Sequence, residues 1–214
     1  MSSFRKDWLI MLILAIIFIV GVLVYPLLPA RVPMHWNATG QVDGYGSRFW
    51  GAFGLPLTAL ALYLLFIFLP RLDPKKENHQ KFSNVYGLLK LIIILFLTIM
   101  YLAQIGFAIG YPINIGFITK FCVGLIFAVV GNYFGKLRFN YFVGIRTPWT
   151  LANEQVWTKT HRMAGPLWVG AGGVFIFSAF FNAAWTFWLS IGALMLAVVI
   201  PFIFSYLLFT KLQS

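Results

Sequence analysis

The chain alternates between long apolar segments and short polar ones. The apolar runs, each with at most one charge, are residues 8–28, 49–70, 84–109, 113–134 and 163–210. About 20 apolar residues cross the roughly 30 Å hydrocarbon core of a bilayer as a helix, so each of the first four runs is predicted to be one span. The last run is long enough for two, with Asn182, Trp185 and Trp188 marking the turn between them. The pattern therefore predicts an all-α integral membrane protein with six transmembrane helices.

Composition and charge agree with that class. Of the 214 residues, 61% are hydrophobic and 10% are charged, whereas about a quarter of an ordinary soluble domain is charged. The net charge of +11 follows the predicted topology. With both termini placed in the cytoplasm, twelve of the sixteen basic residues lie on the inner side: Arg5, Lys6, Arg71, Lys75, Lys76, Lys81, Lys136, Arg138, Arg146, Lys159, Arg162 and Lys211. The positive-inside rule explains this excess, so we expect no direct nucleic-acid binding.

The predicted spans divide the chain into two halves of one compact membrane domain. Residues 1–112 form an N-terminal half, whose extracytoplasmic loop at 29–48 contains turn-forming glycines and is expected to be ordered. Residues 113–214 form a C-terminal half. Its cytoplasmic loop at residues 135–162, named here the signature loop, connects the fourth and fifth spans.

The signature loop is too apolar for a solvated linker. Its tryptophans are typical of the headgroup level of a membrane. Pro148 followed by Thr150 indicates a helix start, with Thr150 as the N-cap and a short interfacial helix over residues 151–162. Glu154 is the only carboxylate after Glu77 in the sequence, and we expect it to pair with Arg146, whose guanidinium can hold a carboxylate through two hydrogen bonds.

Two roles are open for this loop. It can anchor the helix ends at the membrane surface, or it can form a recognition surface for a partner. The candidate residues for either role are Asn132, Arg138, Asn140, Gly144, Arg146, Thr147, Trp149, Glu154, Trp157, Thr160 and His161.

The extracytoplasmic loop carries a second candidate group: His35, Trp36, Asn37 and Asp43. His35 and Asp43 could form an acid–base pair or contribute to a metal site, but two such residues are too few for a structural metal. We rather expect Asn37 and Asp43 to cap the backbone of their own loop.

The sequence shows no P-loop, Gly-x-Ser-x-Gly or His-Glu-x-x-His motif, so no enzymatic activity, cofactor or metal is expected. A membrane enzyme or a lipid-handling protein with Glu154, His161 and Arg146 around a headgroup stays as an alternative. A transporter is less favoured, because no acidic residue lies within a predicted span.

The two loops also carry a family resemblance. The stretch from Gly131 to Leu151, with Val156-Trp157-x-Lys159-Thr160-His161-Arg162-x-x-Gly165, resembles the signature of the SdpI family. The extracytoplasmic loop, with Pro33-x-His35-Trp36-Asn37 and Asp43-Gly44-Tyr45-Gly46, resembles a domain of unknown function usually found before it. Together with the spans, the two resemblances cover nearly the whole chain.

The resemblance implies a binding function in the bacterial plasma membrane. The founding member of the family is an immunity protein against a secreted killing-factor peptide toxin, SdpC, and it also holds a cytosolic autorepressor at the membrane when toxin is bound. By resemblance, the expected partners are membrane lipids, a secreted peptide toxin and a cytosolic repressor protein. The toxin would be met from the outer face or within the bilayer, and the signature loop would face the repressor.

Overall fold

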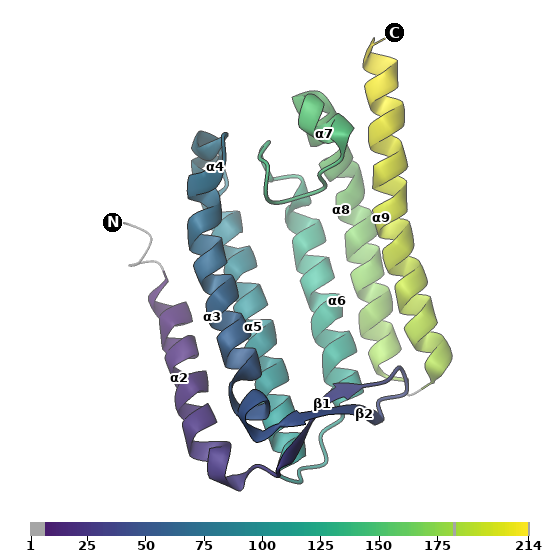
Figure 1. The fold of residues 1–214 in the computed structure, drawn as a ribbon. Coiled ribbons are helices and arrows are strands. Elements are labelled where there is room, and N and C mark those ends of the chain that lie inside the picture. The colour runs from purple at the N-terminus through teal and green to yellow at the C-terminus, as the bar shows by residue number, and fades with distance from the viewer. Residues whose placement is uncertain (1–6, 182, 214) are drawn as a thin grey trace. The chain divides into compact units, whose positions relative to one another are not determined.

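The computed structural model describes residues 7–181 and 183–213. The chain forms two compact units, one of Met1–Leu65 with Lys90–Thr119 and the other of Phe66–Leu89 with Lys120–Ser214. Most of the described chain is helical (Figure 1). The elements are α2 (Trp8–Val24), the 3-10 helix η1 (Tyr25–Leu27), β1 (Arg31–Trp36), β2 (Val42–Ser47), α3 (Arg48–Leu72), α4 (Lys76–Lys81), α5 (Ser83–Ala108), α6 (Ile115–Phe134), α7 (Pro148–Ala152), α8 (Glu154–Ala179) and α9 (Ala184–Gln213).

Five of the described helices are long and apolar enough to cross a membrane. They are α2 with η1, α3, α5, α6 and α9. The chain is thus a multi-pass membrane protein. Helix α8 has 26 residues, but its first turns are polar and its second half is rich in glycine, so composition does not single it out as a span. The sixth span stays a prediction that rests on α8.

The helix boundaries follow the apolar pattern closely. The long uncharged run of residues 163–210 is divided between α8 and α9, as expected. Asn182, which marks the predicted turn, lies outside the described residues, as do Arg5 and Lys6.

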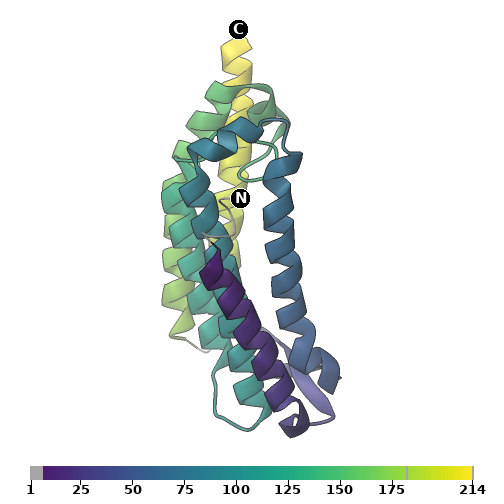
Figure 2. The ribbon, with the colours of Figure 1, turned by 90° about the vertical axis from the view of Figure 1, so that its left-hand side faces the viewer.

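One departure from the all-α prediction lies in the first unit. Strands β1 and β2 pair antiparallel and form a hairpin between α2 and α3 (Figure 2). Val32 of β1 is fully buried, and Gly51 in α3 packs so closely on it that an added Cβ would lie 2.7 Å from the Val32 side chain. The ring of Trp36 meets that of Phe107 edge to face at 5.6 Å. These contacts hold the hairpin on the helices of its own unit.

The first unit also contains a buried ion pair. Lys90 Nζ lies 2.5 Å from Asp7 Oδ2, and both side chains are less than a tenth exposed. The Lys90 ammonium also lies over the Tyr63 ring, 5.6 Å from its centroid. The Lys90 ammonium is thus engaged within its own unit by both a carboxylate and an aromatic ring.

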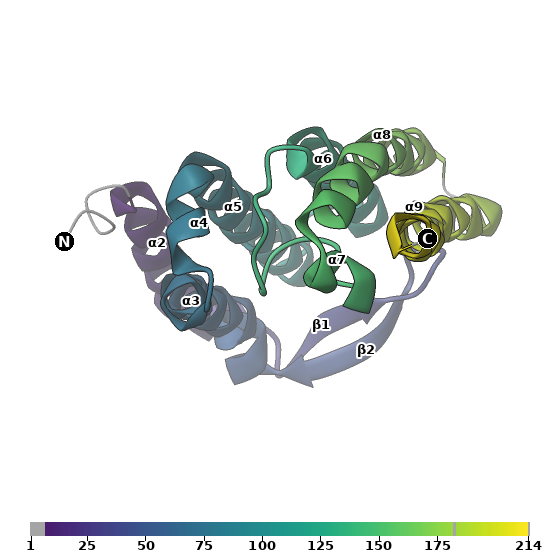
Figure 3. The same ribbon diagram turned by 90° about the horizontal axis from the view of Figure 1, so that it is seen from above.

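Helices α6 and α8 of the second unit approach each other through glycines. A Cβ on Gly131 would lie 2.7 Å from the Gly165 carbonyl oxygen, and a Cβ on Gly124 would lie 2.7 Å from that of Gly172. The pairs are seven residues apart on both helices, so the two backbones run side by side for two turns (Figure 3). Small residues allow such close packing between membrane helices.

The turn between α8 and α9 is held by a lysine from α6. Lys120 Nζ donates to the carbonyl oxygens of Ser178 and Phe181, at 3.5 and 3.3 Å, and to the Thr186 hydroxyl at 3.1 Å. The Ser178 carbonyl belongs to the last turn of α8, where carbonyl groups have no partner within the helix. Lys120 thereby connects three helices of the second unit.

Candidate functional site

The signature loop leaves α6 and turns at once around Asn140. This side chain is fully buried. Its amide nitrogen donates to the Arg138 and Val143 carbonyls, and its oxygen accepts from the Phe142 and Val143 backbone N–H groups. Asn140 thus uses its whole hydrogen-bonding capacity within the loop and determines the path of residues 138–143.

The next part of the loop lies against two stacked rings of α8. Trp157 and His161 stack with their ring centroids 4.1 Å apart, and Trp157 Nε1 donates to the Leu137 carbonyl at 3.1 Å. Gly144 passes over both rings with φ +122°, and a Cβ there would lie 2.5 Å from His161 Nε2. Only glycine suits this conformation and this space. The N–H of Ile145 then donates to His161 Nε2 at 2.9 Å.

His161 is a neutral structural histidine in the first turns of α8, before the uncharged stretch that begins at residue 163. It is 1% exposed, and its Nδ1 lies 2.7 Å from the Trp157 carbonyl oxygen, to which it donates. Burial lowers the pKa of the imidazole to about 4, and the hydrogen bond to the Trp157 carbonyl offsets only part of that effect. Both ring nitrogens are engaged with the backbone, so His161 has no atom left for proton transfer or metal binding.

The helix start in this loop differs from the prediction. Thr147, and not Thr150, is the N-cap of α7: its hydroxyl accepts from the Thr150 N–H, and the Thr150 hydroxyl accepts in return from the Thr147 N–H. The reason is Pro148, which takes the first helical position and leaves the cap to the residue before it. The Thr147 hydroxyl also lies 3.0 Å from that of Ser205, which fastens the cap to α9.

The predicted separate helix over residues 151–162 is also not observed. Helix α7 ends at Ala152, and Asn153 caps a new helix by accepting from the N–H groups of Gln155 and Val156. That helix, α8, continues through Arg162 to Ala179 without interruption. Helix α8 continues past Gly165 and Pro166, so the predicted interfacial segment becomes its first turns.

Three further candidates have different surroundings. The Trp149 ring packs against Phe202 and Tyr206 of α9, with centroids 5.1 and 5.0 Å away. Thr160 is fully buried in α8, and its hydroxyl has no hydrogen-bond partner among the described residues. Asn132 is exposed near the end of α6.

The predicted pair of Arg146 and Glu154 does not form. The Arg146 guanidinium donates to the Tyr141 carbonyl at 2.7 Å, and among the described residues no ion pair joins it to Glu154. Glu154 instead lines a pocket of about 310 Å³ together with Arg138. Its position at the first turn of α8 is itself favourable for an acid, because the N-terminal end of a helix carries partial positive charge.

The alternative of an enzymatic or headgroup-binding centre made of Glu154, His161 and Arg146 gains no geometric support. His161 is buried under the loop, while Arg146 and Glu154 are exposed. Among the described residues no hydrogen bond joins any two of the three.

Asp73, which is not among the candidate residues, binds the signature loop from the segment that follows α3. Asp73 follows α3 and is 2% exposed. It accepts hydrogen bonds from the backbone N–H groups of Lys75 and Tyr141, at 2.7 and 3.1 Å, and from His79 Nε2 at 2.8 Å. Burial tends to raise the pKa of this carboxyl, but the hydrogen bonds outweigh it and the pKa is lowered.

The sequence did not predict this contact between Asp73 and the signature loop, because Asp73 lies in a charged connection whose composition is typical of a solvent-exposed segment. Asn78, four residues before Phe82 in the same connection, donates to the Phe139 carbonyl at 2.9 Å. The available signal was Asp73 next to Pro74, a pair typical of turns whose side chain bonds to the backbone.

The extracytoplasmic candidates lie in the hairpin of the first unit. Asn37 caps the turn as predicted, accepting from the backbone N–H groups of Thr39 and Gln41 at 3.0 Å each. Asp43 does not cap the backbone; its carboxylate lies 2.5 Å from His35 Nδ1 across the hairpin. Within the described residues no group of three or more His, Cys, Asp or Glu side chains converges to hold a metal.

Comparison with known proteins identifies both loops. Residues 136–205 match the profile of the SdpI/YfhL protein family, and residues 12–60 match a domain of unknown function (DUF1648). The chain is similar to the Immunity protein SdpI of Bacillus subtilis (strain 168), with 28% identity over 210 residues, or 98% of this chain and 99% of that protein. No solved protein structure matches it significantly. The resemblance of the signature loop to this family is confirmed.

Proposed function

We propose that this chain, a member of the SdpI/YfhL family, is a membrane immunity protein that protects its cell against a secreted, membrane-active peptide toxin. The observation that carries this proposal is the similarity to an immunity protein along 98% of the chain. Because that similarity includes the hairpin, the apolar helices and the signature loop, it supports a shared function of the whole molecule and not of one domain.

The proposed topology has six spans, with α8 from residue 163 onward as the fifth and both termini in the cytoplasm. The support is the distribution of basic residues, since Lys and Arg accumulate in the loops that stay on the inner side. In this arrangement the hairpin faces the outside of the cell and the signature loop faces the cytoplasm.

The hairpin is the proposed surface that meets the toxin. Its side chains are well exposed at His35 and Tyr45, while Val32 and Trp36 attach it to the helices. It thus combines a fixed backbone with side chains that are available to a peptide arriving from outside.

The signature loop is the proposed surface for a cytosolic repressor. Its buried members, such as Asn140 and His161, maintain the loop, whereas Arg138 and Arg146 are exposed and can contact a partner. The structural and recognition roles of the loop thus fall on different residues.

Survival of a toxin-sensitive strain tests the immunity function. Cells expressing the full chain should survive secreted killing peptide at doses that kill cells with an empty vector. Tyr45→Ala in the hairpin should reduce survival, and Tyr111→Ala serves as the control, because that tyrosine is similarly exposed but lies between α5 and α6. If the intact chain, present in the membrane at normal yield, protects against no membrane-active peptide, the proposal is wrong.

The repressor function has its own readout. A fluorescently tagged DNA-binding repressor of the host should move to the membrane only when toxin is present. The double variant Arg138→Ala with Arg146→Ala should prevent this movement at unchanged membrane yield, while Lys76→Ala on α4 should not. If all variants recruit the repressor to the membrane equally well, the signature loop is not the surface that binds it.

A further inference from the structure

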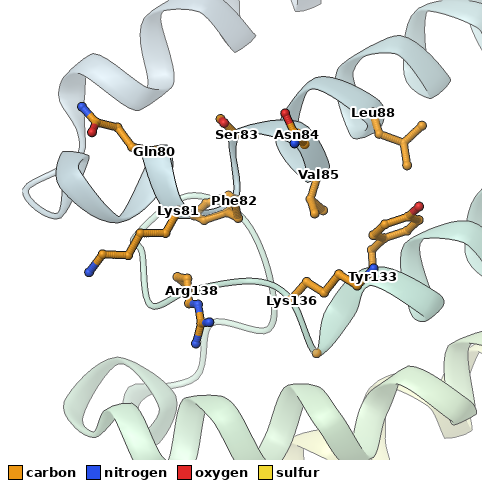
Figure 4. Close-up of a pocket in the computed structure, with 11 residues that line it drawn as sticks. Gln80, Lys81, Phe82, Ser83, Asn84, Val85, Leu88, Tyr133, Lys136 and Arg138 are labelled. Atoms are coloured by element: carbon orange, nitrogen blue, oxygen red, sulfur yellow. The ribbon is translucent and has the colours of Figure 1, made fainter.

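A pocket of about 480 Å³ opens beside the signature loop, at the ends of two candidate membrane spans. Its walls are the end of α4, the first turns of α5, the last turn of α6 and the residues just after α6 (Figure 4). All of these residues belong to the second unit. Nothing in the proposed immunity function accounts for this pocket.

The polar wall of the pocket is cationic. Lys81, Lys136 and Arg138 line it, all three are exposed, and no Asp or Glu is among the lining residues. The Lys136 ammonium lies 4.5 Å from the centroid of the Tyr133 ring, which holds it at the α6 side. Lys81 Nζ donates to the Asn78 side-chain oxygen at 2.9 Å, which holds it at the α4 side.

Other donors complete the polar wall. The Ser83 hydroxyl and the Asn84 side chain belong to the first turn of α5 and line the same pocket. Glu154 lines only the smaller neighbouring pocket, which shares Lys81 and Arg138 with this one. The two pockets together are lined by three cationic residues and one acidic residue, so their combined charge is positive.

The opposite wall is apolar and continues toward the membrane span. Val85 and Leu88 of α5 line it, together with the ring of Tyr133. Since α5 and α6 are both candidate spans and the pocket lies where they end, it is at the level of the lipid headgroups. The pocket therefore combines an anion-binding wall with a surface suited to an acyl chain.

We propose that this pocket binds the phosphate group of an anionic phospholipid. The phosphate lies among Lys81, Lys136 and Arg138, and the upper part of an acyl chain lies along Val85 and Leu88. Arg is suited to hold a phosphate through two parallel hydrogen bonds, and basic pockets between membrane helices recognise lipid headgroups in this way. A free phosphate offers the same anionic group without the acyl chain.

The test measures lipid binding to the purified, delipidated full chain in a non-ionic detergent. Native mass spectrometry with added phosphatidylglycerol should show stoichiometric binding, at higher affinity than phosphatidylcholine. Each neutralised cation should weaken binding about fivefold, so Lys136→Gln combined with Arg138→Gln should weaken it about 25-fold. Lys76→Gln on α4 removes one charge outside the pocket, as each single pocket variant does inside it, and should have little effect.

A competition experiment separates the two sources of phosphate. Inorganic phosphate at millimolar concentration should displace little phosphatidylglycerol if the acyl chain contributes, and Leu88→Asn should then weaken lipid binding. Efficient displacement with no effect of Leu88→Asn would assign the pocket to a soluble phosphate compound and overturn the lipid. Equal binding of both lipids, or an equal loss in Lys76→Gln, would overturn the site altogether. Survival of toxin is a separate readout, so a failure here does not touch the immunity function.

Discussion

Gly144 lies directly on His161, so close that a single added carbon would stand 2.5 Å from the Nε2 atom of the ring. The same nitrogen accepts the N–H of Ile145, one residue further along. The signature loop is thus seated on the side chains of α8 by its own backbone. This contact leads to the first prediction.

Gly144→Ala should sharply reduce the amount of folded protein in the membrane. The new methyl group collides with His161, and φ +122° is unfavourable for any residue with a Cβ, which together cost about 3 kcal/mol. Thermal unfolding in detergent measures the loss. Gly135→Ala is the matched control, since its Cβ would meet only an ordinary contact at 3.6 Å from Arg162. Equal stability of the two variants would contradict the close seating of the loop.

Gly131→Ala should destabilise the packing of α6 on α8. The added carbon would lie 2.7 Å from the Gly165 carbonyl oxygen, and backbone cannot move aside as a flexible side chain can, so we expect a cost of about 1–3 kcal/mol. Gly173→Ala on α8 has open space and should be neutral or stabilising by up to about 1 kcal/mol. Unfolding midpoints of the two variants provide the comparison, and a stable Gly131→Ala protein would show that the helices are further apart.

Lys90→Met should destabilise the protein strongly, because it leaves the buried Asp7 carboxylate without its ammonium partner. Breaking a buried pair costs about 3–5 kcal/mol. The double variant Asp7→Leu with Lys90→Met should recover much of that stability, since no buried charge is then left. A double variant that is as unstable as the sum of the single ones would mean that the two residues do not interact.

The stability of the second unit should fall as the pH is lowered from about 6.5 to about 4. In the unfolded chain His161 takes up a proton below pH 6.5, whereas burial keeps the pKa of the folded imidazole at about 4. Stability is therefore full above pH 6.5, and its loss across this window amounts to about 3 kcal/mol. His161→Gln should show a smaller decline between these pH values than the unaltered chain. His35→Gln, which removes an exposed histidine, should retain the full decline.

Arg146→Ala and Glu154→Ala should have independent effects. The two residues have different surroundings, so the double variant should lose the sum of the single losses. A double variant no worse than either single one would restore the ion pair that the sequence suggested. Unfolding midpoints of the three variants decide the matter.

The apolar pattern alone was sufficient to locate the five candidate membrane helices of the described chain. Their boundaries depend on the length of hydrocarbon to be crossed and on the positions of charged residues. Both are local features of the sequence. For this reason the division of residues 163–210 into two helices followed from the length of the run and the polar and aromatic residues at its middle. The residue types of the signature loop were equally informative and indicated the family that the chain resembles.

Tertiary structure decided which side chains meet. Lys120 reaches the α8–α9 turn, Asp73 reaches the signature loop, and Arg146 bonds to a backbone carbonyl of its own loop, because hydrogen bonds between separate segments depend on how the helices pack. The order of opposite charges along the chain carries no information on that packing. For the same reason the cationic pocket, formed by residues from separate parts of the chain, appears only in the folded protein.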